Sequence, residues 1–201
     1  MSFDVEQLRN QIPFYLTAKP EQKELLHNLE SLIRGTNKGY YISAARDVSD
    51  DAVLQGDGRN GLQLYSFEDG KKHEVRGIVL SNTCDISTDN ERVWVPRIIF
   101  APIVKLSAIE ARFKVHQLAE DAIKSRIKSI KNQSVTNIFY LPSGARLDED
   151  HVVLLDDLHS MPAGKLSGEK LFTLSMAGFY LFSFKLSIHF CRLQENIDRR
   201  P

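Results

Sequence analysis

The sequence has little cysteine: its 201 residues include two, Cys84 and Cys191, and no CxxC pair. So few cysteines exclude a disulfide-rich scaffold. The segment MSFDVEQLRNQ at the start is charged and lacks the apolar core of a secretory signal. We therefore expect a cytoplasmic protein in which both thiols are reduced.

An excess of one charge is also lacking, because 26 Lys and Arg residues balance 26 Asp and Glu residues. This excludes a non-specific basic coat for nucleic acid, although a local basic patch stays possible. Long apolar runs are scarce too. Residues 171–184 are uncharged for 14 residues, whereas a membrane-spanning helix needs about 20. We expect a buried strand followed by a buried helix there, and no membrane partner.

The pattern of apolar residues predicts an α+β fold in one compact domain. Helices are expected at 4–11, 20–33, 107–131 and 176–195. Ser107 is the expected N-cap of the third, with Glu110 completing a capping box. Short segments rich in aromatic and branched residues are typical of antiparallel strands: GYYISA, GLQLYSF, EVRGIVLS, RVWVP, IIFAPIVKL, TNIFYLP and DHVVLL.

Four motifs follow one another along the chain: Gly56-Asp57, Arg76 ahead of the strand GIVLS, the segment VWVP, and the segment HVVLLDDLHSMP. In this order they resemble the MazF/PemK family of toxin endoribonucleases, over residues 56–106 and 137–163. The resemblance implies a small SH3-like antiparallel β-barrel. It would occupy residues 39–165 with the 107–131 helix inserted, between an N-terminal helical region (1–38) and a C-terminal strand and helix (166–201).

The chain departs from the family pattern at several positions. Gly77 follows Arg76 where the family usually has proline, and Val104 lies near the place of the family's threonine. Glu74 stands loosely in the place of the family's glutamate. The TCDIS extension instead resembles uncharacterised bacterial proteins that carry LSxxCD after the same strand.

The resemblance implies RNA cleavage without a metal or other cofactor, in which a 2′-hydroxyl attacks the adjacent phosphorus. Arg76 would stabilise the negative charge on the phosphoryl oxygens, since a planar guanidinium suits them. His73 is the candidate general acid or base, and Lys71 and Lys72 are candidates to hold phosphate. The alternative is a solvated hairpin in which Arg76 pairs with a nearby glutamate.

Five small polar residues follow the strand GIVL, and three interpretations of them remain open. They line a pocket for RNA or a partner, or the thiol is a nucleophile with a nearby base. In the third interpretation the carboxylate bonds turn amides and the thiol is a small buried side chain. The residues are Ser81, Asn82, Thr83, Cys84 and Asp85.

Two further groups of charged residues are candidates for a function. Lys124, Lys128 and Lys131 form a helical stripe that either contacts a nucleic-acid backbone or is a solvated face. The acidic segment LDEDHVVLLDDLH has the residue types of a metal site but not the ligand spacing. We therefore expect no metal there.

Two functions of different classes fit these observations. The first is a MazF-like endoribonuclease toxin of a toxin–antitoxin or defence system, homodimeric, cutting single-stranded RNA and inhibited by an antitoxin. The second is a non-catalytic barrel that binds RNA or a partner protein in a bacterial defence or regulatory complex.

Overall fold

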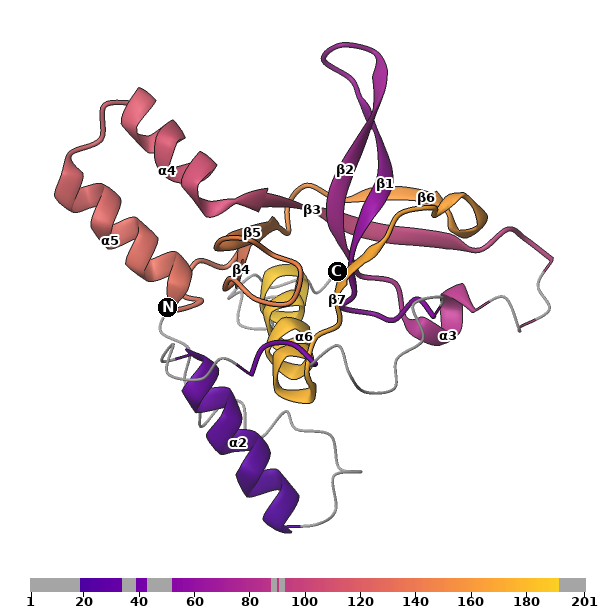
Figure 1. Cartoon of the computed structure of the whole chain (residues 1–201), viewed down its shortest axis with the longest axis horizontal. Helices are drawn as coiled ribbons and strands as arrows, with labels where there is room; N and C mark the ends of the chain where they lie inside the picture. The colour runs from indigo at the N-terminus through magenta and orange to yellow at the C-terminus, as the bar shows by residue number, and fades with distance from the viewer. Residues whose placement is uncertain (1–18, 34–38, 43–51, 88–89, 91–92, 192–201) are drawn as a thin grey trace, which may run out of the picture.

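The computed structural model describes residues 19–33, 39–42, 52–87, 90 and 93–191. These residues form five α-helices and a seven-stranded sheet in which every pairing is antiparallel (Figure 1). The predicted α+β class is confirmed. The helix expected at 4–11 lies outside the described residues.

The sheet is open rather than closed within the described residues. Its strands pair in the order β4-β5-β3-β2-β1-β7, and β6 also pairs with β3. The path therefore ends at β4 and β7, so the expected barrel is not confirmed. The strands are β1 (Gly58–Ser66), β2 (Lys71–Val79), β3 (Arg97–Lys105), β4 (Ile138–Leu141), β5 (His151–Leu154), β6 (His159–Pro162) and β7 (Lys170–Phe172).

Strand β3 joins the two halves of the sheet. One edge of β3 pairs with residues 77–79 of β2, and its other edge pairs first with β6 and then with β5. Because side chains alternate along a strand, Ile98 and Phe100 enter one apolar cluster, whereas Ala101 and Ile103 enter another. Both faces of the sheet are thus covered near β3.

The helices are α2 (Lys19–Ile33), α3 (Thr83–Ile86), α4 (Leu106–Val115), α5 (Glu120–Lys131) and α6 (Met176–Cys191), with a 3-10 turn η1 at Ala163–Lys165. Leu181 and Phe182 of α6 are fully buried in the larger cluster, with Leu29 of α2. The predicted strand and helix in 171–184 are confirmed as β7 and α6. Within the described residues, no helix has the length and apolarity needed to cross a membrane.

The predicted single helix at 107–131 is wrong, because the chain forms two helices, α4 and α5, joined at Gln117. Gln117 has a φ of 56°, which ends α4 without the glycine or proline that would mark a break. Ser107 is not the N-cap. Helix α4 begins at Leu106, and the Ser107 hydroxyl donates instead to Glu149 Oε2 at 2.7 Å.

One predicted strand is wrong, and another is reduced to a single bridge in its described part. Residues 93–96 of the VWVP segment form no strand, and Val93, Trp94 and Val95 are largely exposed. In the GYYISA segment Tyr41 makes an isolated bridge with Leu174, and residues after 42 lie outside the described part. β-propensity favoured strands at both places, but propensity alone does not make a strand without a partner to pair with. Beside the end of β7, the Ile42 N–H donates to the Thr173 carbonyl at 3.0 Å, so the GYYISA segment makes one bridge there and no ladder among the described residues.

A buried polar contact joins α6 to the turn after α5. The Lys185 ammonium, 1% exposed, donates to the Gln133 carbonyl oxygen. The Gln133 amide in turn donates to the Tyr140 carbonyl at 2.9 Å and accepts from the Tyr140 N–H at 3.1 Å. Desolvation by burial lowers the pKa of Lys185 to about 7.

Candidate functional site

The β1–β2 hairpin projects beyond the sheet (Figure 1). This happens because β3 pairs with β2 at residues 77–79, while residues 71–75 of β2 pair with 62–66 of β1 in a two-stranded ribbon. We call this ribbon, residues 62–76, the arm. Most of the predicted catalytic and phosphate-binding residues lie on it.

One face of the arm carries only exposed side chains, and we call it the outer face. Strand alternation and the cross-strand pairs Gln63–Glu74 and Tyr65–Lys72 put its side chains on the same side. The opposite, inner face carries Leu62, Leu64 and Val75, which pack in the apolar cluster that also holds Ile98 and Phe100. The outer face consists of Gln63, Tyr65, Lys72, Glu74 and Arg76, all of them exposed.

Alternation separates the two predicted catalytic residues. His73 and Arg76 are three positions apart in one strand, so their side chains point to opposite faces about 10 Å apart along the chain. His73 Nε2 lies 2.8 Å from Asp69 Oδ2. Glu74 shares the outer face with Arg76, at about 7 Å along the strand. The arm thus groups Arg76 with Glu74 and Lys72, and it leaves His73 and Lys71 on the inner side.

A bulge in β1 lies opposite Arg76. The register shifts between Arg59 and Leu62, so that Asn60 and Gly61 face a single residue of β2. Gly61 has a φ of +74°, and a Cβ there would lie 2.6 Å from the Gly168 backbone nitrogen. The base of the arm is therefore held directly against the segment before β7.

Two aromatic rings lie at the tip of the arm. The Tyr65 and Phe67 ring centroids are 5.3 Å apart at 85°, and the two side chains are 49% and 93% exposed. Aromatic rings exposed in this way are suited to stacking on unpaired bases.

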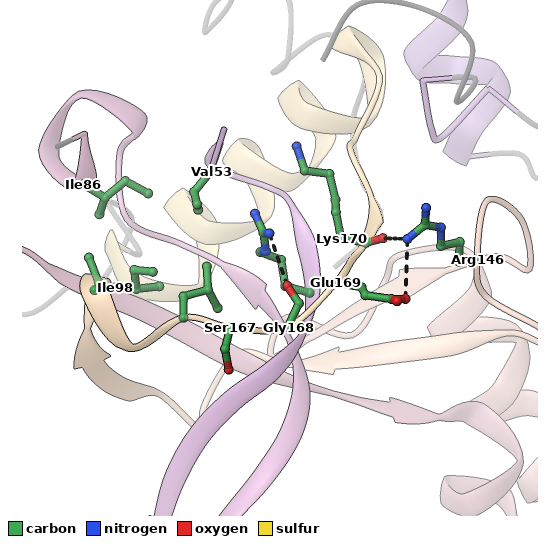
Figure 2. Close-up of a pocket in the computed structure, with 12 residues that line it drawn as sticks. Val53, Ile86, Ile98, Arg146, Ser167, Gly168, Glu169 and Lys170 are labelled. Atoms are coloured by element: carbon green, nitrogen blue, oxygen red, sulfur yellow. Dashed lines mark hydrogen bonds and ion pairs between the residues drawn. The ribbon is translucent and has the colours of Figure 1, made fainter. Parts of the chain in front are cut away.

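A cleft of about 580 Å³ lies beside the inner face of the sheet (Figure 2). Arg59 of β1, which lines it, pairs with Gly77 and so points away from the outer face that carries Arg76. The apolar side chains on its wall are those of Val53, Ile86, Ile98, Ala163 and Leu166. Its charged lining residues are Arg59, Arg146, Glu169 and Lys170.

The charged wall of the cleft is tied to a buried carboxylate. Asp57 is fully buried, and its Oδ2 lies 3.2 Å from Lys170 Nζ and accepts from the Leu54 N–H at 2.9 Å. Asp57 Oδ1 accepts from the Thr173 hydroxyl at 2.7 Å. The Gly56-Asp57 motif thus has a structural role here, since it connects the start of β1 to β7.

The two arginines of the cleft contact the segment before β7. Arg59 Nη2 donates to the Gly168 carbonyl at 3.3 Å. Arg146 Nη1 donates to the Lys170 carbonyl at 2.9 Å and lies 3.7 Å from Glu169 Oε2 (Figure 2). These residues were not among the predicted site residues, because they come together from segments far apart in the chain.

The Ser81–Asp85 segment is a strand-to-helix turn. The Ser81 hydroxyl accepts from the Ile99 N–H at 2.7 Å, Asn82 caps α3 by accepting from the Cys84 N–H at 3.0 Å, and Thr83 Oγ1 accepts from the Gln55 N–H at 3.1 Å. Cys84 is exposed, so the interpretation of it as a small buried side chain is wrong. Asp85 is also exposed, in the first turn of α3.

The lysine stripe of α5 has acidic neighbours. Lys131 Nζ lies 2.8 Å from Asp150 Oδ2, and Lys124 Nζ lies 4.0 Å from Asp121 Oδ1. Lys128 is exposed in the last turn of α5. These pairs weaken the stripe as a continuous track for phosphates.

The acidic segment 148–159 is engaged in ion pairs. Asp148 and Glu149 contact the Lys105 ammonium at 3.3 and 2.5 Å. The hydrogen bond from Lys105 lowers the pKa of Glu149. Throughout the described part of the chain, no group of three or more His, Cys, Asp or Glu side chains is placed to hold a metal ion.

No protein-family model and no curated protein matches this chain. The similarity to the MazF/PemK family therefore stays a prediction from the motifs. The outer face of the arm and the cleft are two candidate sites among the described residues.

Proposed function

We propose that the protein is a metal-independent endoribonuclease of the MazF/PemK type, which binds single-stranded RNA on the outer face of the arm. The observation that carries this proposal is the exposed side-by-side placement of Glu74 and Arg76 on that face. A carboxylate and a guanidinium two positions apart supply a base and a stabiliser of phosphoryl charge. The pairing replaces the combination of His73 and Arg76 that the sequence favoured.

The reaction needs one proton transfer and one displacement. The Glu74 carboxylate takes the proton of a 2′-hydroxyl, and the 2′-oxygen then forms a bond to the adjacent phosphorus. The bond from phosphorus to the 5′-oxygen breaks, and that oxygen takes a proton from water. Arg76 donates to the phosphoryl oxygens, whose negative charge grows in the transition state. The products are a 2′,3′-cyclic phosphate and a 5′-hydroxyl.

The rest of the outer face and the tip of the arm suit a single strand. Lys72 lies across the ribbon from Tyr65, so a cation and an aromatic ring are cross-strand neighbours. Phosphate contacts position a strand, and stacking on Tyr65 and Phe67 holds unpaired bases. A duplex would keep its bases stacked on one another and would not use these rings.

The same exposure suits regulation by a protein partner. An antitoxin would inhibit the enzyme by covering the outer face, and a homodimer would present two such faces. Both are parts of the proposal, as is action in the cytoplasm. Co-expression of a candidate antitoxin should block cleavage. It should also protect exposed amines on the arm, such as that of Lys72, from chemical labelling.

The test is incubation of the purified protein with mixed single-stranded RNA in EDTA. We expect cleavage that leaves 2′,3′-cyclic phosphate ends. Glu74→Gln and Arg76→Ala should each lower the rate by about 100-fold or more, whereas the matched His73→Gln variant should keep it. Absence of cleavage by the wild type would refute the nuclease. A loss with His73→Gln as large as that with Glu74→Gln would restore the pairing expected from the sequence.

A second candidate function is a non-catalytic RNA-binding module. It is favoured by the position of His73, the usual acid or base at neutral pH, on the side of β2 away from Arg76. In that case RNA should bind to the wild type in a filter assay while the cleavage assay stays blank. Lys72→Gln and Arg76→Ala should then weaken RNA binding rather than catalysis.

A further inference from the structure

The cleft beside the inner face has the size and the two-sided lining of a small-molecule site. Its volume is about 580 Å³, within the range of roughly 300–1,000 Å³ that is common for ligand sites. One side is apolar and carries Ile86 and Ile98, and the other carries Lys170 and Arg146 (Figure 2). A ligand with an apolar or planar body and an anionic group would match both sides.

Three cationic side chains converge on the charged side from separate segments. Arg59 comes from β1, Arg146 from the segment before β5, and Lys170 from β7. Arg59 and Lys170 are 7% and 8% exposed, and placing cations in so little water is costly unless anionic partners are near. Asp57 lies against Lys170, and Glu169 lies at the edge beside Arg146.

The rim of the cleft leaves one of these cations accessible. The Arg146 side chain is 55% exposed, and its contact with Glu169 is long, at 3.7 Å. A guanidinium has five N–H donors, so Arg146 can bind an incoming phosphate with two parallel hydrogen bonds while its Nη1 still donates to the Lys170 carbonyl. The other two cations are fixed by contacts within the protein: Arg59 donates to the Gly168 carbonyl, and Lys170 pairs with Asp57.

We propose that the cleft binds a nucleoside monophosphate or a phosphate ester of similar size. The phosphate lies against Arg146, with Arg59 and Lys170 behind it, and the planar base lies on the apolar side formed by Val53, Ile86 and Ile98. This site is separate from the outer face of the arm, because Arg59 and Arg76 point to opposite faces of the β1–β2 pair. It holds whether or not the arm cleaves RNA.

Calorimetric titration of the full chain with adenosine 5′-monophosphate tests the site, with adenosine and inorganic phosphate as partial ligands. The monophosphate should bind more tightly than either part, because each part contacts one side of the cleft. Arg146→Ala should weaken monophosphate binding by about tenfold or more. The matched control is Arg112→Ala, which removes the same charge from the exposed surface of α4 and should leave binding unchanged.

Three results would overturn the proposal. The first is no heat of binding at millimolar monophosphate with the wild type, and the second is equal weakening by Arg146→Ala and Arg112→Ala, which indicates general charge attraction. The third is equal affinity for adenosine and its monophosphate, which indicates an apolar pocket without a phosphate site. Glu74→Gln should still bind the monophosphate, and Arg146→Ala should still act on RNA. The titration therefore tests the cleft, and the cleavage assay tests the arm, each without depending on the other.

Discussion

The outer face of the arm and the charged wall of the cleft both present cations, but they hold them in different ways. On the arm, Lys72 and Arg76 lie in a two-stranded ribbon and are exposed. In the cleft, Arg59 and Lys170 are buried and contact the residues that join β1 to β7. Charges on the arm can therefore change without disturbing the fold, whereas the buried charges of Arg59 and Lys170 cannot.

The largest expected effect comes from the buried pair of the cleft. Lys170→Met removes the cation beside Asp57 and leaves a carboxylate that is 0% exposed without it. Loss of one partner from a buried ion pair costs about 3–5 kcal/mol of stability. Urea unfolding should show this decrease, and it should show no change for the matched Lys72→Met variant on the arm. An equal loss in both variants would contradict the distinction between the two regions.

A medium effect is expected at the tip of the arm. Tyr65→Ala removes an exposed ring that contacts Phe67, and stacking on a base is worth about 1–3 kcal/mol. Affinity for single-stranded RNA should fall accordingly in a filter-binding assay, while the thermal midpoint stays the same. Phe190→Ala, which removes another exposed aromatic ring from α6, is the control and should bind RNA as the wild type does. If both variants lose affinity equally, the arm is not the stacking surface.

The last prediction concerns a buried cation with a neutral acceptor, Lys185. Its effect on the free energy of unfolding is small at each step of one pH unit. Lys170 contacts a carboxylate, whereas Lys185 donates to the Gln133 carbonyl, and burial lowers the pKa of Lys185 from 10.5 to about 7. Between these two values the unfolded chain binds more protons at this lysine than the folded chain. The contribution of Lys185 to stability therefore improves as pH rises, by up to about 1.4 kcal/mol per pH unit.

Urea unfolding at several pH values from neutral to about pH 10 checks this contribution. The wild type should become more stable over that range relative to Lys185→Met, in which the lysine no longer titrates. The difference between the two proteins should stay constant below neutral pH, where the lysine is charged in both states. A difference that does not vary with pH would mean that Lys185 is protonated throughout.

The sequence predicted the parts of the fold that depend on local patterns. The periodic apolar residues of α2 and α6 and the branched residues of β1, β2 and β3 were sufficient to place those elements. The break at Gln117 was not predictable, because no glycine or proline marks it. The prediction that Ser107 caps the helix was wrong for a different reason. The Ser107 hydroxyl donates to Glu149, which comes from a distant segment of the chain.

The candidate sites divide in the same way. The outer face of the arm was within reach of the sequence, since alternation in KKHEVRGIV already puts Glu74 with Arg76 and His73 on the other side. The cleft was not, because Arg59 and Lys170 meet only when β1 pairs with β7. One of the three interpretations made Cys84 a small buried side chain, but Cys84 is exposed on α3.

The contact between Gly61 and Gly168 has a consequence for how the protein can evolve. A Cβ on Gly61 would lie 2.6 Å from the Gly168 nitrogen, and a Cβ on Gly168 would collide with the Asn60 carbonyl. Neither glycine can be replaced unless the two segments move apart, which would shift both the arm and the Gly168 carbonyl that Arg59 contacts. In any set of relatives the two positions should be glycine together, and a lineage that loses one should also have rebuilt the bulge.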